Sequence, residues 1–264
     1  MLISRRTGLK LAAALLGSAL IPAFAMGQDA PRDASMDMPK VLTHATDAGD
    51  VVIHPVDHAS MVWETPAGVI YVDPVGGAEA YADLPAPDLI LITHEHGDHF
   101  DQPTLDALAE VPMITNQAVF DMLPEAMQGR ATAMANGDTG TALDYDLEAI
   151  PAYNITEDRL QYHPQGRDNG YILAIGGKRF LIAGDTEDTP ELRALKDIHV
   201  AFLPMNLPYT MTVEQAADAV AAFQPQTVYP YHFRDSDVEE FARLVSEGDA
   251  ETEVVIADWY HAAS

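Results

Sequence analysis

Three histidines and an aspartate occupy four of six consecutive positions, at His94, His96, Asp98 and His99. They follow the apolar run Leu89–Ile92, which is typical of a β-strand buried on both faces. Because His94 and His96 are two positions apart, extended backbone places both side chains on one side, where they can bind the same ion. A bend at the intervening glycine could turn Asp98 and His99 toward a second ion. Imidazole nitrogen and carboxylate oxygen suit Zn²⁺, Mn²⁺ or Fe, so the cluster predicts a metal site.

Three residues elsewhere in the chain could complete a site for two ions. The apolar run Leu181–Ala183 is followed by one glycine and then Asp185. His232 comes shortly after the predicted strand Thr227–Tyr229. His163 lies in a polar loop between these residues and the first cluster. A carboxylate can bridge two cations about 3.5–4 Å apart, because its negative charge lowers their mutual repulsion. Asp185 is therefore a candidate bridge.

In their order along the chain, these residues resemble the ligands of the metallo-β-lactamase superfamily. The resemblance extends from about residue 51 to the end of the chain. Neighbouring segments resemble a small branch of exported, metal-dependent hydrolases: His58-Ala59-Ser60, Val72-Asp73-Pro74, Ala183-Gly184-Asp185-Thr186 and Tyr231-His232. The resemblance implies an α/β fold, a four-layer αββα sandwich with the metals at one edge. It assigns one ion to His94, His96 and His163 and the other to Asp98, His99 and His232, with Asp185 as the bridge.

The elements that must position these residues alternate β-strands with helices. Short β-rich runs such as Ser60–Glu64 and Val69–Val72 come early, and helices such as Thr212–Phe223 come later. Ala142–Ile150 is predicted to be one strand. This order predicts a layered α/β domain with helices on the faces of sheets. No polar linker divides the chain, so residues 51–264 are predicted to form one domain.

The first 25 residues match an export signal peptide. They carry three positive and no negative charges, an apolar run from Leu11 to Ala25, and the small-x-small cleavage pattern Ala23-Phe24-Ala25. The apolar run is shorter than the roughly 20 residues of a membrane anchor, so we expect cleavage near Ala25 and no stable anchor. Ser4–Lys10 resembles the twin-arginine consensus, with Sec export as the alternative route. The mature protein is therefore predicted to be periplasmic or secreted.

Residues 26–50 contain Gly, Pro, Asp, Ser and Met without periodicity, which predicts a flexible leader. The whole chain has 264 residues, with 14 Lys+Arg against 41 Asp+Glu and a net charge of −27. A hydrophobic content of 48% favours a globular protein despite this charge. Nucleic acids repel such a polyanion, so no nucleic-acid partner is expected. The absence of cysteine leaves histidine and carboxylate as the strong metal ligands. The oligomeric state is not indicated.

Two cations that share a water lower its pKa toward about 7. We therefore predict a hydrolase that uses a hydroxide held by two divalent ions to attack an ester, a lactone or a phosphodiester. Zn²⁺ is the first choice of ion, with Mn²⁺ or Fe as alternatives. Asp98 is the predicted catalytic residue, since it could orient the hydroxide. We expect the substrate to be a small molecule, neutral or tolerant of a cationic group.

Two other functions are compatible with the pattern. One is an exported protein that binds metal but has little catalytic activity. Against it, all seven expected ligand positions carry a histidine or an aspartate. The other is a di-iron redox member of the same fold, for which the resemblance would imply glutamate where His96 stands.

Four further residues are candidates for roles around the metals. Asn206 and Tyr209 lie in a loop after the predicted strand Val200–Leu203, where they could contact substrate or simply shape the start of the next helix. His58 could orient a ligand through a hydrogen bond or lie on the surface. Asp73 could likewise orient a ligand or only form an Asp-Pro turn.

Overall fold

The computed structural model of the chain describes residues 38–108 and 110–260. The predicted signal peptide, residues 1–25, and the leader residues 26–37 lie outside the described residues. Within the described ranges, no helix has the length and hydrophobicity that a membrane span requires.

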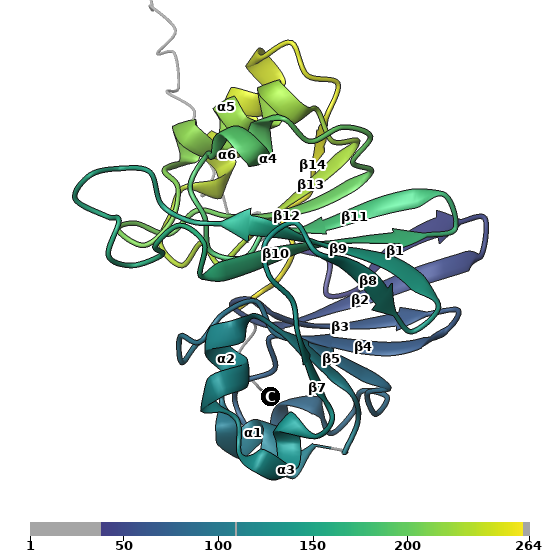
Figure 1. Cartoon of the computed structure of the whole chain (residues 1–264). Coiled ribbons are helices and arrows are strands. Elements are labelled where there is room, and N and C mark those ends of the chain that lie inside the picture. Colours follow the sequence, from purple (N-terminus) through teal and green to yellow (C-terminus); the bar gives the residue numbers. More distant parts are fainter. Residues whose placement is uncertain (1–37, 109, 261–264) are drawn as a thin grey trace, which may run out of the picture. The chain divides into compact units, whose positions relative to one another are not determined.

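Two mixed β-sheets of seven strands each face one another (Figure 1). In spatial order, the first sheet contains β1 (Leu42–Thr46), β2 (Gly49–Asp57), β3 (Ser60–Thr65), β4 (Gly68–Val72), β5 (Leu89–Leu91), β6 (Met113–Thr115) and β7 (Ala131–Ala133). The second contains β14 (Glu253–Val254), β13 (Thr227–Tyr231), β12 (Val200–Pro204), β11 (Lys178–Ile182), β10 (Asp168–Ile175), β9 (Tyr145–Ala152) and β8 (Thr139–Ala142).

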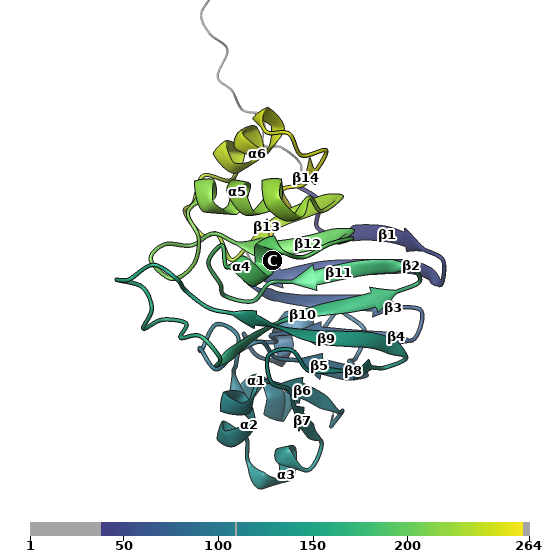
Figure 2. The ribbon, with the colours of Figure 1, turned by 45° about the horizontal axis from the view of Figure 1, so that its top comes forward.

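Helices cover the outer face of each sheet, which gives four layers (Figure 1). The first sheet carries the 3₁₀ helix η1 (Ala78–Tyr81) and the helices α1 (Gln102–Ala107), α2 (Gln117–Met122) and α3 (Glu125–Gln128). The second carries α4 (Pro190–Arg193), α5 (Val213–Phe223) and α6 (Val238–Glu247), and Figure 2 shows α5 and α6 side by side on its outer face. The predicted αββα sandwich is therefore confirmed.

Strand β3 shows why the sheets are buried on both faces. Trp63 packs between the sheets, with its ring 5.7 Å from that of Phe180 and 5.8 Å from that of Phe202. Its neighbour Val62 belongs instead to the apolar cluster beneath the helices, which includes Leu105 of α1. Successive side chains of a strand point to opposite faces, so consecutive apolar residues fill both the inter-sheet core and the helix layer.

Both sheets combine antiparallel strands with a parallel part. Strands β4 to β7 are parallel neighbours in the first sheet, and β11 to β14 are parallel neighbours in the second. Parallel neighbours have their carboxyl ends at the same edge of a sheet, so the loops after β4, β5, β11, β12 and β13 begin there. In open α/β sheets this is the edge where ligands bind.

The sheets begin earlier than predicted, at Leu42 rather than Val51. Residues 42–50, which we expected in the flexible leader, form β1 and the start of β2, with pairing from Leu42↔Ile53 to Thr46↔Gly49. Only Leu42 is fully buried in β1, and the other four side chains are partly or wholly exposed. An edge strand with so little buried surface carries a weak apolar pattern, which explains the error.

The predicted strand Ala142–Ile150 is confirmed from Tyr145 onward as part of β9, but its first residues belong to the end of β8 and to a turn. The chain turns between β8 and β9, with Leu143 in the left-handed region at φ 51°. Because this turn contains no glycine or proline, the sequence carries no strong turn signal.

His44 lies in β1, and its surroundings there lead us to expect that the free energy of unfolding depends on pH. Its Nε2 lies 3.0 Å from the Tyr229 hydroxyl. Burial, and to a smaller extent Lys178, lowers the pKa of His44 from 6.5 to about 4. Between these values the unfolded chain binds a proton that the folded protein does not, so the free energy of unfolding should fall as the pH is lowered through this range.

The variant His44→Gln lacks this titration and should lose less stability over the same range. Denaturant unfolding at several pH values measures the difference. An identical pH dependence in the variant and the wild type would contradict the assignment.

Candidate metal centre and active site

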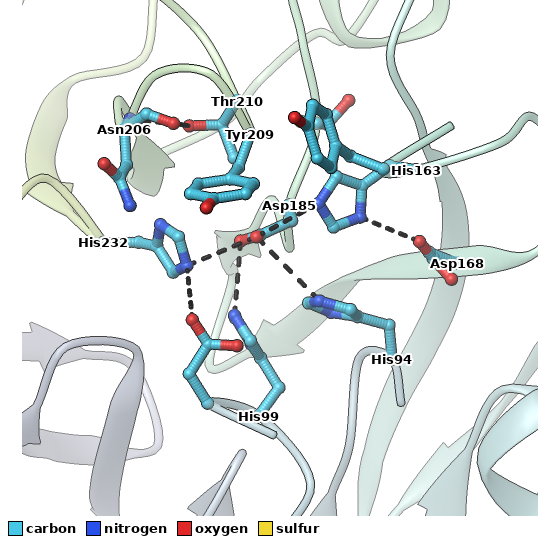
Figure 3. A network of polar contacts seen from close by, with 12 residues as sticks. His94, His99, His163, Asp168, Asp185, Asn206, Tyr209, Thr210 and His232 are labelled. Atoms are coloured by element: carbon cyan, nitrogen blue, oxygen red, sulfur yellow. Dashed lines mark hydrogen bonds and ion pairs between the residues drawn. The ribbon is translucent and has the colours of Figure 1, made fainter. Parts of the chain in front are cut away.

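The predicted metal ligands gather at the edge where the parallel strands end. The segment His94–His99 follows β5, Asp185 follows β11, and His232 follows β13 directly. His163 comes from the loop between β9 and β10, and its side chain is fully buried. Four separate parts of the chain therefore meet in one place (Figure 3).

Asp185 lies at the centre of this cluster, facing four imidazole Nε2 atoms (Figure 3). Those of His232, His99 and His163 lie 3.3, 3.4 and 3.4 Å from its oxygens, and that of His94 lies 3.9 Å away. Burial by itself would raise the pKa of Asp185. The neighbouring histidines, with His232 and His99 foremost, outweigh this effect and hold the pKa well below its usual range. Asp185 is therefore an anion at neutral pH.

The possible ligand atoms form three clusters, and within each cluster all atoms lie within 4.8 Å of one another. The clusters are His94, His96 and His163; His58, Asp98 and His232; and His94, His99 and Asp185. The first is one of the two predicted ligand sets. The second contains two members of the other predicted set, but His58 stands in the place expected for His99.

Asp73 fixes the orientation of two of these histidines. Its Oδ2 lies 2.7 Å from His99 Nδ1 and accepts the Thr93 hydroxyl proton at 2.7 Å. Because that proton is used, Thr93 Oγ1 acts as the acceptor for His94 Nδ1, 3.0 Å away. In both histidines Nδ1 carries a proton toward these oxygens, so Nε2 is the nitrogen available to a cation. Asp73 therefore does more than form an Asp-Pro turn.

Asp168 holds His163 in the same way, and the sequence analysis did not identify it. Its Oδ2 lies 3.0 Å from His163 Nδ1. Arg167 binds both oxygens of this carboxylate, at 2.7 and 2.8 Å, and also binds Glu95 Oε1 at 2.8 Å. The available signal was an aspartate five positions after a candidate ligand, in the polar loop that we expected there, whereas the structure places it at the first residue of β10.

Several polar atoms at the centre are buried and have no hydrogen bond within the described part of the chain. They include Asp185 Oδ1 and the Nε2 atoms of His94, His99, His163 and His232, and His58 Nε2 and His232 Nδ1 are unpaired as well. Each unpaired buried polar atom costs about 1–3 kcal/mol, so several of them in one place would be expensive without a bound partner. Imidazole nitrogen with carboxylate oxygen is a donor set for divalent cations, so these residues fit a metal site.

His58 is 2% exposed, which rules out the surface placement considered for it. The Tyr260 hydroxyl oxygen accepts the backbone N–H groups of Phe233 and Arg234, at 3.0 and 2.7 Å. With both of its lone pairs engaged, it donates its own proton to His58 Nδ1, 2.8 Å away. His58 Nε2 then carries the ring proton and faces Asp98 Oδ2 at 3.4 Å. A protonated nitrogen cannot bind a metal, so in this tautomer His58 faces Asp98 as a polar neighbour and not as a metal ligand.

A cavity of about 400 Å³ opens over the centre. Its lining includes five predicted ligands and both predicted substrate-binding residues: His96, Asp98, His163, Asp185 and His232, with Asn206 and Tyr209. The loop that carries Asn206 and Tyr209 follows β12, and the Asn154 side chain donates to the Tyr209 carbonyl at 2.8 Å. Tyr162 and Arg234, which we did not predict, also line the cavity.

Gly184 allows Asp185 to reach the centre. Its φ of 66° lies in the left-handed region, and a Cβ there would lie 2.7 Å from the Asn169 carbonyl oxygen. Gly184→Ala should therefore lower the free energy of unfolding by about 2–4 kcal/mol, through both backbone strain and this contact.

Gly137→Ala is the matched control, because Gly137 has a φ of 89° with nothing within 4 Å of an added Cβ. It should cost only the backbone strain, about 1–2 kcal/mol. Urea unfolding measures both values, and equal losses would show that the contact at Asn169 does not matter.

Comparison with known proteins places this geometry in a family. The family model described as a beta-lactamase superfamily domain matches residues 52–232. A UPF0173 metal-dependent hydrolase of Pyrococcus abyssi is 30% identical over 193 residues, which cover 67% of this chain and 85% of the relative.

Two solved structures have the same fold. One is of a Parabacteroides distasonis protein described as a metal-dependent hydrolase. It is 41% identical, with a TM-score of 0.73, and the match covers 82% of this chain and 97% of that one. The other is Igni18, a metallo hydrolase of Ignicoccus hospitalis, which is 25% identical with a TM-score of 0.63 over 77% of this chain and 94% of that one. The predicted metallo-β-lactamase fold is confirmed, and the chain belongs to the beta-lactamase superfamily, among relatives named UPF0173 metal-dependent hydrolases.

Proposed function

We propose that this protein is a hydrolase that binds two divalent cations and cleaves an ester, lactone or phosphodiester bond in a small molecule. The observation that carries the proposal is the group of buried, unpaired Nε2 atoms around the Asp185 carboxylate. The names of the relatives, metal-dependent hydrolases, support the reaction class. The mixture of imidazole and carboxylate donors favours Zn²⁺, with Mn²⁺ or Fe as alternatives.

The proposed ligands are His94, His96 and His163 for one ion and Asp98, His99 and His232 for the other, with Asp185 between them. When bound, such a pair of ions supplies an acidic water as nucleophile and positive charge for the substrate oxygen that becomes negative.

Asp98 is the residue that we propose to orient the nucleophile. Its side chain is 40% exposed and lines the cavity. Burial would raise its pKa, but the contacts with His232 and His58 outweigh burial and hold the pKa below its usual range. Both contacts are made to Oδ2. Asp98 is therefore an anion, and its Oδ1, which has no hydrogen bond within the described residues, can accept a proton of the nucleophile.

Asn206 and Tyr209 are proposed to contact the substrate, because both line the cavity next to Asp98. The export-signal pattern of residues 1–25 supports a site of action in the periplasm or outside the cell. The substrate would then be a small molecule that is encountered there.

Asp185→Ala should remove about one of two equivalents of metal and lower hydrolysis at least about 100-fold, because it deletes the carboxylate shared by both proposed sites. Metal analysis by mass spectrometry and a panel of chromogenic ester, lactone, phosphodiester and β-lactam substrates measure the two effects. Asp146→Ala, which removes an exposed carboxylate from β9, is the control and should change neither.

Retention of both equivalents by Asp185→Ala would contradict the bridging role. A wild-type protein that holds two equivalents of metal but hydrolyses no substrate of the panel would favour the alternative of a metal-binding protein. Bound iron in a protein that hydrolyses no substrate of the panel would favour the redox alternative.

Tyr260→Phe tests whether His58 positions Asp98. Without the phenol proton, His58 Nδ1 has no donor, so the proton can move to Nδ1 and the contact to Asp98 is lost. We expect kcat to fall about tenfold with the metal content unchanged.

His58→Gln keeps a side-chain N–H donor and should retain more activity than His58→Ala. Tyr145→Phe is the matched control, since the Tyr145 hydroxyl also accepts a backbone N–H, that of Ala67, but lies outside the cavity lining. Equal losses of kcat in Tyr260→Phe and Tyr145→Phe would reduce the role of Tyr260 to packing.

A further inference from the structure

Two side chains on the cavity lining have hydrogen-bond donors that no other described residue uses. Arg234 is exposed, and its guanidinium has no hydrogen bond or ion pair within residues 38–108 and 110–260. The side-chain amide of Asn206 has none there either, since only the Asn206 backbone is bonded, to Thr210 and Tyr209. Both groups are free to bind an acceptor that enters the cavity.

A free arginine is unusual in this chain, where acidic residues outnumber basic residues 41 to 14. In the described part, every other arginine side chain binds an acceptor. The partners are carboxylates for Arg159, Arg167, Arg179, Arg193 and Arg243, and the Val111 carbonyl for Arg130. Among the described arginines, Arg234 thus lacks a partner, and it lies in the wall of the active-site cavity.

The backbone holds Arg234 in this position. Its φ of 41° lies in the left-handed region, as does the φ of 48° at His232, two residues earlier. A non-glycine residue there costs of order 1–3 kcal/mol and persists only where its surroundings fix it. The Tyr260 hydroxyl supplies such a contact, since it accepts the Arg234 N–H at 2.7 Å.

The charges in the cavity favour a negative group of the substrate. Apart from the histidines, the other ionisable acid and base side chains of the lining are Asp98 and Asp185, and both face the proposed cations. The groups that remain to bind a substrate are the hydrogen-bond donors of Arg234 and Asn206. A guanidinium can bind two oxygens of a carboxylate or phosphate at once. The net charge of −27 opposes such a group, but salt at physiological strength screens those acidic residues that lie more than about 8 Å from it.

Two tyrosines offer a surface for the uncharged part of a substrate. The rings of Tyr162 and Tyr209 lie 4.9 Å apart, edge to face, and both line the cavity. Tyr209 is exposed, so its ring is available for contact.

We propose that the substrate carries an oxyanionic group, a carboxylate or a phosphate, which Arg234 binds with the Asn206 amide while the rest of the molecule lies against Tyr162 and Tyr209. The proposal rests on the proposed function for the identity of the site, and it narrows the substrate class to anionic esters, lactones or phosphodiesters. It replaces the neutral substrate that the net charge led us to expect.

The test compares two para-nitroanilides that differ only in charge. Succinic acid mono-para-nitroanilide carries a carboxylate where the isocaproic anilide has an isopropyl group of similar shape. Titration calorimetry on the purified full protein measures the binding of both without requiring turnover. We expect the wild type to bind the succinyl compound about tenfold more tightly, Arg234→Met to lose most of this preference, and Arg234→Lys to keep part of it.

Arg243→Met is the control, since Arg243 pairs with Glu240 and Glu247 on the exposed side of α6 and should leave the preference unchanged. The matching para-nitrophenyl esters test the carboxylate preference in turnover, and bis-para-nitrophenyl phosphate tests whether a phosphodiester is cleaved. Equal binding of both anilides by the wild type, or an unchanged preference in Arg234→Met, would overturn the proposal. A preference that depends on Arg234 without hydrolysis of any ester would support the anion site and count against the proposed function.

Discussion

The Asp185 carboxylate is buried away from water, so its surroundings in the site must supply positive charge. Burial of an unpaired carboxylate costs several kcal/mol. Without a cation, protons on the surrounding histidines supply the charge: burial lowers the pKa of His163, but Asp168 and Asp185 outweigh it and raise the pKa to about 9. A divalent cation would satisfy the same carboxylate and the unpaired nitrogens together.

A second layer of polar groups determines which nitrogen of each histidine faces the centre. Asp73 holds His99, Asp168 holds His163, and Tyr260 holds His58, in each case through Nδ1. For His99 and His163 the arrangement leaves Nε2 for a cation, whereas for His58 it leaves a proton that faces Asp98. Asp73 lies directly after β4, Asp168 is the first residue of β10, and Tyr260 lies in the segment after β14. The orientation of the ligands is thus set by the fold before anything binds, which lowers the cost of ordering them.

The sheets explain how residues so far apart in sequence meet. Each sheet has a parallel part, and parallel strands bring their carboxyl ends to one edge. The loops after β4 and β5 in the first sheet therefore meet those after β11, β12 and β13 in the second. The rigid inter-sheet core, in which Trp63 packs against Phe180 and Phe202, fixes the positions of these two sets of loops relative to each other.

The sequence by itself determined the buried strands and the candidate ligand residues that follow them. Leu89–Ile92 and Leu181–Ala183 are continuous apolar runs because both faces of these strands are covered, and a polar residue directly after such a run lies at the sheet edge. β1 escaped prediction because an edge strand buries few of its side chains and carries little of this pattern.

Only the tertiary structure decided how the residues around the ligands pair. Tyr260 and His58 are 202 positions apart, and nothing in either local sequence indicates that one donates to the other. The contact between Asp168 and His163, the proton on His58 Nε2 and the free guanidinium of Arg234 are of the same kind. A hydrogen bond or its absence depends on positions within a few tenths of an ångström, and such positions arise only when distant elements pack together.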